Sequence, residues 1–387
     1  MIYLDNSATT FPKPACMWKA MEKCLREYCG NPGRSGHEMA LKTGEGVYEA
    51  RKTLAALLGA EEPGQILFTL NATEALNLGI LGVLGPGDRV VTTAMEHNSV
   101  LRPLKMAEGW GVETDILKCG PDGTLPLDNL KKALQKKKTR LVVCTHASNV
   151  TGTIMPVAEA GALAREAGAL FLVDGAQSAG SLEIHVRDMN MDLLALSGHK
   201  GLLGPQGTGL LYVRRGIPLR PLKYGGTGTN SRSRLQAGEF PEDYEAGTVN
   251  SPGVIGLGAS VRWLLQTGVS RIRAHEMRLM ARLDAGLRAI PGVSVYGPED
   301  PARRAGALSF NIAGLDCEKA ADILARQYGV ALRAGFHCAG LAHKTIGTWE
   351  TGALRAGIGP FTTEEDLRTL LDAVEELTRP IWAKKPG

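Results

Sequence analysis

Short runs of strand-forming residues alternate with helix-like segments between about residues 65 and 215, and this alternation restricts the chain to few folds. The strand-like runs are QILFTL (65–70), RVVTTAME (89–96), RLVVCTHAS (140–148), LFLVDGAQS (170–178) and LLALSGHK (193–200). Segments such as TEALNLGILGVL (73–84) and VAEAGALAREAG (157–168) lie between them, with apolar residues three and four positions apart. Such repeats predict parallel strands joined by right-handed crossovers. We therefore expect a three-layer α/β domain with a mainly parallel sheet.

The length of 387 residues favours two domains, because single compact cores rarely grow this large. A stretch rich in glycine and polar residues, 223–253, has no sustained periodicity, and helical patterning resumes after it. Two further strand-like runs follow, ALSFNIAG (307–314) and VALRAGFH (330–337). An amphipathic helix with a threonine N-cap is predicted over 362–382. We expect a large domain over 15–254 and a smaller α+β domain over 255–387, with the N-terminal segment 1–14 packed near the latter.

Charge and hydropathy indicate neither a nucleic-acid partner nor a membrane segment. The formal net charge is only +4, and the one basic cluster, KKALQKKKTR (131–140), is typical of a solvated helix end before a strand. The N-terminal residues lack the features of a signal peptide. No run approaches the roughly 18 apolar residues that span a bilayer. We expect neither nucleic acid nor a membrane as a partner.

The seven cysteines are scattered, odd in number and without a CxxC pair, which favours a reducing cytosol over a disulfide framework. The chain is therefore expected to be cytoplasmic. Cys16, Cys24 and Cys29 fall close together, but their spacing matches no usual metal-ligand pattern and no histidine completes the set. We expect these three side chains to pack on a helix, and we expect no metal site.

Polar side chains follow the predicted strands where each strand ends. Asp174 and Gln177 end one strand, and Ser197, His199 and Lys200 end the next. The carboxyl ends of parallel strands meet at one edge of the sheet, which is where such folds bind ligands. Desolvation lowers the pKa of a lysine amine, so that it can form a Schiff base. A Schiff-base lysine beside an aspartate that bonds a ring nitrogen is the arrangement that binds pyridoxal phosphate.

The phosphate of such a cofactor needs an anion site. A helix is predicted to open near Thr73, and the N–H groups of its first turn favour an anion. His97 and Asn149 end further strands and could contact the ring or the substrate. Each residue alone has an ordinary structural alternative: Asp174 as a turn cap, His97 as a structural histidine, Lys200 as a surface lysine. Their common position at one sheet edge favours the cofactor.

The segment RAGFHCAG (333–340) contains Cys338 among polar and small neighbours. Buried structural cysteines usually lie in apolar runs, as Cys144 does, which we expect in the core. An inert Cys338 remains the alternative, but its flanks favour a nucleophile. A free thiol is only a few per cent ionised at neutral pH. We expect Arg333, His337 and the substrate-bound cofactor to lower the cost of forming the thiolate.

These segments together resemble the cysteine desulfurases, which are class V, fold-type I pyridoxal phosphate enzymes, over essentially the whole chain. The matching motifs, in order, are YLDNSATT, NPGRSGH, NATEALN, EHNS, SNVTGT, VDGAQ, SGHKGLLGPQGTGLLYVR, EAGTVN and RAGFHCA. The RAGFHCA loop resembles the second group of desulfurases and the selenocysteine lyases. The resemblance implies a fold-type I transferase with a smaller α+β C-terminal domain.

The resemblance also implies roles for individual residues. Lys200 would hold the cofactor covalently and move protons, His97 would stack on the ring and shuttle protons, and Cys338 would be the nucleophile. Pyridoxal 5'-phosphate would be held by Lys200, Asp174, Gln177, Thr73, Ala72, Asn149, Ser197, His199, His97 and, from a partner chain, Thr248. The substrate would contact Arg355, Asn149 and Arg333.

Two residues depart from the family pattern. Ala72 stands where a second phosphate hydroxyl often occurs, so only its backbone can serve there. Phe336 replaces a histidine that is common before the HC pair, which leaves His337 as the only flanking imidazole. The borrowed Thr248, with the GGTG segment (225–228), implies a homodimer.

The implied reaction converts L-cysteine to L-alanine and leaves a persulfide on Cys338, which a sulfur-acceptor protein then takes, for example for iron–sulfur cluster assembly. A selenocysteine lyase would use the same residues, so the sequence leaves that alternative open. Another class V aminotransferase, epimerase or lyase would not need Cys338. A non-catalytic pyridoxal-binding regulator or scaffold usually carries an extension, for which both termini are short.

Overall fold

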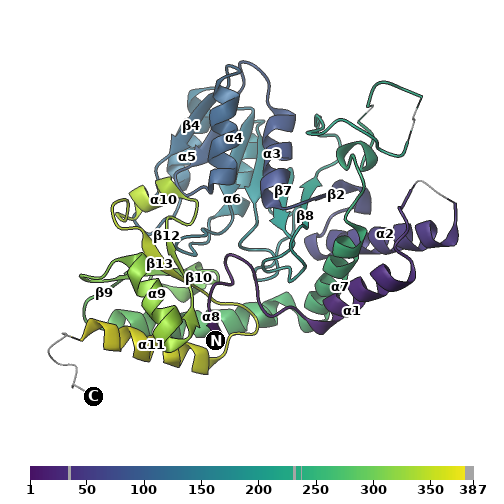
Figure 1. Cartoon of the computed structure of the whole chain (residues 1–387). Coiled ribbons are helices and arrows are strands. Elements are labelled where there is room, and N and C mark those ends of the chain that lie inside the picture. The colour runs from purple at the N-terminus through teal and green to yellow at the C-terminus, as the bar shows by residue number, and fades with distance from the viewer. Residues whose placement is uncertain (34–35, 230–231, 237, 380–387) are drawn as a thin grey trace.

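The computed structural model describes residues 1–33, 36–229, 232–236 and 238–379 (Figure 1). Residues 34 and 35 of the NPGRSGH segment lie outside the described residues, as does the end of the helix predicted over 362–382. The described strands form a seven-stranded sheet, a four-stranded sheet and a two-stranded sheet. The larger two belong to the two halves of the molecule.

The central sheet is mainly parallel, as predicted. Its strands are β2 (Ile66–Thr69), β3 (Arg89–Thr93), β4 (Glu113–Leu117), β5 (Leu141–Thr145), β6 (Leu170–Asp174), β7 (Leu193–Ser197) and β8 (Gly209–Val213). Their order is β2-β8-β7-β6-β5-β3-β4, and only β8 runs antiparallel to its neighbours. Four of the predicted strand runs, β3, β5, β6 and β7, therefore lie side by side, β8 separates them from β2, and the carboxyl ends of all five are at one edge.

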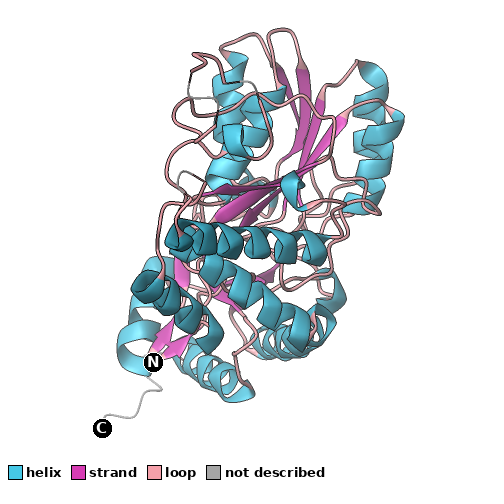
Figure 2. Cartoon of the chain, turned by 90° about the vertical axis from the view of Figure 1, so that its right-hand side faces the viewer, coloured by secondary structure: helices cyan, strands magenta, loops and turns pink. Residues whose placement is uncertain are grey.

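Helices cover both faces of this sheet and complete three layers. They are α1 (Ala15–Glu27), α2 (Glu38–Leu58), α3 (Ala72–Val83), α4 (Asn98–Glu108), α5 (Leu127–Lys136), α6 (Val157–Glu166) and α7 (Ser251–Thr267). Val142 and Cys144 of β5 pack with α2, α5, α6 and α7, so Cys144 is a core residue as expected. Leu141 and Val143 pack with α3 and α4 on the other face. Figure 2 shows the strands between the two sets of helices.

The second half contains an antiparallel sheet in the order β12-β13-β10-β9. Its strands are β9 (Val293–Tyr296), β10 (Ala307–Ile312), β12 (Arg333–Gly335) and β13 (Ala353–Gly357). The helices here are α8 (Val269–Ala289), α9 (Cys317–Tyr328), α10 (Gly340–Thr345) and α11 (Glu364–Thr378). Short 3-10 turns occur at η1 (Pro63–Gln65), η2 (Glu242–Tyr244) and η3 (Pro301–Arg303). Leu279, Phe310 and Leu370 lie in the separate core of this half.

The N-terminal segment joins the second half through β1 (Ile2–Tyr3), which pairs in parallel with β11 (Val330–Ala331). The domain boundary that we predict between residues 254 and 255 falls inside α7, whose residues 254 and 257 pack in the core of the large half. The division into two domains at that boundary stays a prediction. Within the described residues, no helix is long and apolar enough to cross a membrane.

Candidate active site

The carboxyl ends of the central strands surround one pocket. Asp174 is the last residue of β6 and Ser197 the last of β7, and these strands are parallel neighbours in which Asp174 lies opposite Ala195. Nine of the ten predicted cofactor residues line the pocket: Ala72, Thr73, His97, Asn149, Asp174, Gln177, Ser197, His199 and Lys200. Positions spread over more than a hundred residues of sequence therefore converge, and their roles toward a cofactor stay proposals.

Lys200 and Asp174 have pKa values that burial moves in opposite directions. Burial lowers the pKa of Lys200 to about 8, and the charge of Asp174 opposes that change. Burial raises the pKa of Asp174, which a hydrogen bond from the Ala176 amide (2.9 Å) and the charge of Lys200 oppose. A substantial fraction of Lys200 amines is therefore neutral near physiological pH, as nucleophilic or proton-accepting chemistry requires.

One side of the pocket is built for an anion. The Ser197 hydroxyl and the His199 Nδ1 atom are buried and have no hydrogen-bond partner among the described residues. Helix α3 opens here behind its N-cap Asn71, and the first amides of a helix have no intrahelical acceptor. The Thr73 hydroxyl bonds that of Ser99 (2.8 Å). Unpartnered donors at a helix N-terminus fit a phosphate group.

His97 is the N-cap of α4, and its hydrogen bonds define its tautomer. The Ser99 amide donates to His97 Nδ1 (3.0 Å), so that nitrogen carries no hydrogen and Nε2 does. Burial, followed by the charge of Lys200, lowers the pKa of His97 to about 4. The ring is therefore neutral at physiological pH and offers an Nε2–H group as a donor.

Cys338 lies in an exposed turn, outside the lining of this pocket. His337 and Cys338 both have left-handed backbone angles, with φ of 48° and 58°. The Cys338 carbonyl accepts from the Asn98 amide (2.8 Å), next to His97, and the His337 carbonyl accepts from Asn149 Nδ2 (2.6 Å). The turn is thus tied to the edge of the central sheet, and a charge on Cys338 would act on Lys200.

The expectation that His337 favours a Cys338 thiolate by its charge is wrong. The residue is only 5% exposed, and its ring Nε2 donates to the Ala353 carbonyl (3.0 Å). Burial, followed by the charge of Arg355, lowers the pKa of His337 to about 2. The ring is uncharged at neutral pH, whereas Lys200 and Arg355 are cationic groups on which a charge at Cys338 would act.

Arg355 is buried on β13 beside the Cys338 turn, with its guanidinium already engaged. It donates to the Asn149 carbonyl (2.9 Å) and pairs with Asp5 (3.0 Å), while its Nε atom has no partner among the described residues. Arg333, exposed on β12, is its cross-strand neighbour. A substrate carboxylate would therefore meet Arg355 in competition with Asp5, which our sequence reasoning did not single out.

Thr248 and the 225–228 segment lie on the exposed connection between β8 and α7, outside the pocket. Their predicted contribution to a partner's site stays a prediction. Gln177 donates to the Ser7 carbonyl (2.9 Å) and so links the pocket to the N-terminal segment. Ser99 also lines the pocket and was missed; its place after the histidine of EHNS, in the first turn of α4, was the available signal.

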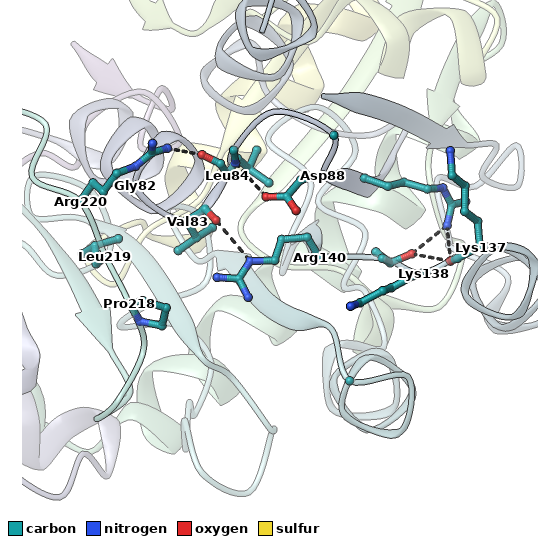
Figure 3. A pocket seen from close by; sticks show the side chains of 15 residues that line it. Gly82, Val83, Leu84, Asp88, Lys137, Lys138, Arg140, Pro218, Leu219 and Arg220 are labelled. Carbon is teal, nitrogen blue, oxygen red and sulfur yellow. Dashed lines mark hydrogen bonds between the residues drawn. The ribbon is translucent and has the colours of Figure 1, made fainter. Parts of the chain in front are cut away.

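A second cavity, of about 860 Å³, lies at the opposite edge of the sheet (Figure 3). Its basic side chains cap the carbonyl ends of helices. Arg140 donates to the Val83 carbonyl (3.3 Å), and Arg89 donates to the carbonyls of Ala133 and Lys137 (both 3.0 Å). Cations there complement helix dipoles, which gives Arg140 of the basic cluster at 131–140 a structural role.

The fold and the pocket are those of a class-V aminotransferase, and comparisons with known sequences and structures agree with this class. The family model for class-V aminotransferases matches residues 2–370, and the chain belongs to that family, in the branch formed by the cysteine desulfurases. Among the described residues, no group of three or more histidine, cysteine or acidic side chains is arranged to hold a metal ion.

Individual relatives cover nearly the whole chain. A probable cysteine desulfurase of Methanothermobacter thermautotrophicus is 38% identical over 97% of this chain and 94% of its own length. The apo structure of a cysteine desulfurase from Thermococcus onnurineus is 36% identical, with a TM-score of 0.91, and covers 97% of this chain and 94% of the other. A cysteine desulfurase of Escherichia coli is 31% identical, with a TM-score of 0.85 and the same coverage.

Proposed function

We propose that this chain is a cysteine desulfurase that uses pyridoxal phosphate to convert L-cysteine to L-alanine and receives the sulfur on Cys338. The observation that carries the proposal is the Cys338 turn. Two hydrogen bonds from Asn98 and Asn149 tie an exposed thiol to the edge of the pocket that holds Lys200 and Asp174. An aminotransferase needs the pocket but not the thiol.

The residues of the pocket fit pyridoxal phosphate. Ser197, His199 and the N-terminus of α3 would hold the phosphate, because they present buried, unpartnered donors. Asp174 would bond the ring nitrogen, and Lys200 would bind the aldehyde carbon. When bound, the cofactor supplies an electrophilic carbon and a ring that accepts the electron pair released at the substrate.

The chain's own side chains would bind the substrate and move its protons. Arg355, with Arg333 and Asn149 beside it, would bind the substrate carboxylate. The Lys200 amine, with a pKa of about 8, would take the proton from the substrate Cα. His97 would stack on the cofactor ring. Its Nε2 would donate a hydrogen bond, because its Nδ1 accepts from the Ser99 amide.

Cys338 would complete the reaction as the nucleophile. Its thiolate would attack the substrate sulfur, forming a sulfur–sulfur bond while the carbon–sulfur bond breaks. The electron pair of that bond stays with the substrate carbon and is protonated, so alanine forms and Cys338 carries a persulfide. A thiol plus cysteine gives a persulfide plus alanine, so the atoms and electrons balance without an added oxidant.

The persulfide implies partners. An acceptor protein with a free thiol would take the outer sulfur from the exposed Cys338, for use in pathways such as iron–sulfur cluster assembly. Thr248 and residues 225–228 would serve the cofactor site of a second copy, so the active unit would be a homodimer. A cytoplasmic location suits a chain that depends on reduced thiols.

A pair of cysteine variants tests this function. In the cofactor-loaded protein, Cys338→Ala should lower alanine formation from L-cysteine at least about a hundredfold while the cofactor absorbance stays unchanged. Cys29→Ser removes another exposed thiol outside the pocket and should retain wild-type activity. Full activity in the Cys338 variant, with a reductant present in every assay, would overturn the proposal.

A further inference from the structure

The turn that presents Cys338 is strained and must be held by its surroundings. Two successive residues without the freedom of glycine, His337 and Cys338, have φ of 48° and 58°. A side chain in the left-handed region is sterically unfavourable, so such a conformation persists only where contacts maintain it. Here the turn is held by the Asn98 amide, which donates to the Cys338 carbonyl (2.8 Å), and by the contacts of His337.

His337 bonds to both halves of the molecule. Its carbonyl accepts from Asn149 Nδ2 (2.6 Å), which follows β5 of the central sheet. Its ring Nε2 donates to the Ala353 carbonyl (3.0 Å), on β13 of the smaller sheet. The residue thus joins the two sheets directly beside Cys338.

These bonds close a ring with Arg355. Asn149 receives a hydrogen bond from Arg355 through its own carbonyl (2.9 Å), and Arg355 lies two positions after Ala353 on β13. A path therefore runs from His337 to Asn149, to Arg355, along β13 to Ala353 and back to His337. This closed path fixes the distance between the Cys338 turn and Arg355.

An acid–base role for His337 does not fit its surroundings. Nε2 is committed to the Ala353 carbonyl, and Arg355 adds a positive charge nearby. The neighbouring ring of His343 lies 5.7 Å away, centroid to centroid, and the charge of Arg333 also opposes an imidazolium. Besides burial, Arg355, His343 and Arg333 lower the pKa of the ring, and the bond to the Ala353 carbonyl raises it. A neutral donor is the form that these groups favour.

We propose that His337 is a positioning residue that sets the place of the Cys338 thiol by joining Asn149 of the large half to Ala353 of β13. The effect of this positioning on catalysis rests on the proposed function. The position of the Cys338 thiol does not depend on that function.

Three variants of the cofactor-loaded protein test the proposal. His337→Ala removes the ring donor, whereas His337→Gln keeps an N–H group at a comparable reach but cannot titrate near neutral pH. His275→Gln is the control, because His275 on α8 makes the same imidazole-to-carbonyl bond, to Thr362 (2.9 Å), at another place. Alanine formation, the rate of Cys338 alkylation by iodoacetamide and the cofactor absorbance are measured from pH 6 to pH 9.

Positioning predicts that His337→Ala keeps its cofactor absorbance but loses about tenfold or more in kcat, with a smaller change in KM for L-cysteine. His337→Gln should recover most of kcat and keep the wild-type pH profile, and the control should match the wild type. Equal losses in the Ala and Gln variants, with one limb of the pH profile missing, would overturn the proposal in favour of acid–base catalysis. So would a kcat within about twofold of wild type in His337→Ala.

The experiment distinguishes a failure of the proposed function from a failure of the positioning role of His337. A wild type that forms no alanine contradicts the proposed function, yet the alkylation rates still report on the thiol. Under positioning, the alkylation rate of Cys338 changes in His337→Ala and returns toward wild type in His337→Gln. If His337→Ala does not fold, the Gln variant decides: a wild-type alkylation rate and pH profile support positioning, and a lost pH limb contradicts it.

Discussion

Burial sets the chemistry of the individual side chains around the pocket. It lowers the pKa of Lys200 to about 8 and that of His97 to about 4. Both groups are thereby brought to states that favour proton transfer or donation at neutral pH. Each shift follows from the low polarity of a site at the end of a buried sheet, more than from any single neighbour.

The pKa of Lys200 predicts how the apo protein takes up pyridoxal phosphate. Only the neutral amine attacks the aldehyde, so the rate should rise about tenfold between pH 7 and pH 9, as a group with pKa of about 8 loses its proton. Stopped-flow absorbance of the yellow complex measures this rate. Lys200→Arg should form no such complex, and a rate that does not vary with pH would contradict the pKa.

Glu96, directly before His97, gives a stability prediction. The carboxyl is fully buried, accepts from the Thr93 hydroxyl (2.6 Å) and the Thr145 amide (3.0 Å), and its pKa is raised by burial to about 8. Because the folded pKa lies above the unfolded value, this group's contribution is complete below about pH 4.5 and is lost as the pH rises through 8.

Glu96→Gln should remove that dependence. Wild type and variant should have similar unfolding free energies near pH 5, and the variant should be more stable by a few kcal/mol, as an order of magnitude, at pH 9. Urea unfolding at a series of pH values measures the difference. Parallel curves for the two proteins would show that Glu96 is not protonated in the fold.

Residue by residue, the sequence located most of the pocket and misjudged one charge. Asp174, Lys200 and Asn149 were found because each follows a recognisable buried strand. The state of His337 was not predictable, because it depends on tertiary burial and on the charge of Arg355, which lies on β13. Asp5 was missed for the same reason.

At the level of elements, helix α3 connects local sequence to the anion site. Its N-cap Asn71 accepts from the Glu74 amide (2.9 Å), which satisfies one donor and leaves others for a phosphate. The helix then buries its apolar residues under the sheet. The same short segment therefore supplies stability and a binding surface.

Asn71→Ala should lower the unfolding free energy by about 1 kcal/mol and also weaken pyridoxal phosphate binding. Thr363→Ala is the matched control, because Thr363 caps α11 in the smaller half by the same kind of bond, to the Asp366 amide (3.2 Å). It should cost similar stability without affecting the cofactor. Thermal unfolding of apo protein and cofactor titration separate the two effects, and equal cofactor affinities in both variants would contradict the role of α3.

Sequence patterns did not predict strands β4 and β8, because one is partly exposed and the other runs antiparallel to its neighbours. Strand β4 is the edge of the central sheet, and only its last residue, Leu117, is buried, so it shows no buried run. Strand β8 is fully buried but antiparallel, and the strand–helix rhythm does not indicate a reversed strand. The start of α7 at Ser251 was obscured by the polar stretch before it.

At the scale of the whole molecule, Arg304 joins the two halves. It is fully buried and donates to the Thr151 carbonyl (2.7 Å) near the central sheet, while it also pairs with Asp284 on α8 (3.2 Å). The proposed active site depends on this connection, since Lys200 belongs to one half and Cys338 to the other. A buried ion pair is weak evidence for net stability, but losing one partner is costly.

Arg304→Met should therefore lower the unfolding free energy by about 3 kcal/mol or more, because Asp284 and the carbonyls lose a buried donor. Arg282→Met changes a residue of α8, the helix that carries Asp284, and breaks an exposed ion pair with Glu364 (2.6 Å). This variant should lose less than about 1 kcal/mol of unfolding free energy. Urea denaturation of both variants makes the comparison. Similar losses would mean that Arg304 does not hold the halves together.

The placement of the N-terminal segment near the second half was predictable, and β1 pairs there with β11. Its further contacts were not. The carbonyl of His199, next to Lys200, accepts from the Thr10 amide (3.1 Å) and from Lys13 Nζ (2.6 Å). Such contacts join positions almost 190 residues apart, and no local pattern encodes them.

Mass spectrometry of the cofactor-loaded protein after one brief exposure to L-cysteine tests the central claim most directly, with alanine quantified in the same sample. The account predicts the added mass of one sulfur atom on the Cys338 peptide and one equivalent of alanine per site. L-Selenocysteine in a parallel sample distinguishes a lyase specific for selenium. Alanine without sulfur on Cys338, or a yellow protein that gives neither product, would contradict the account.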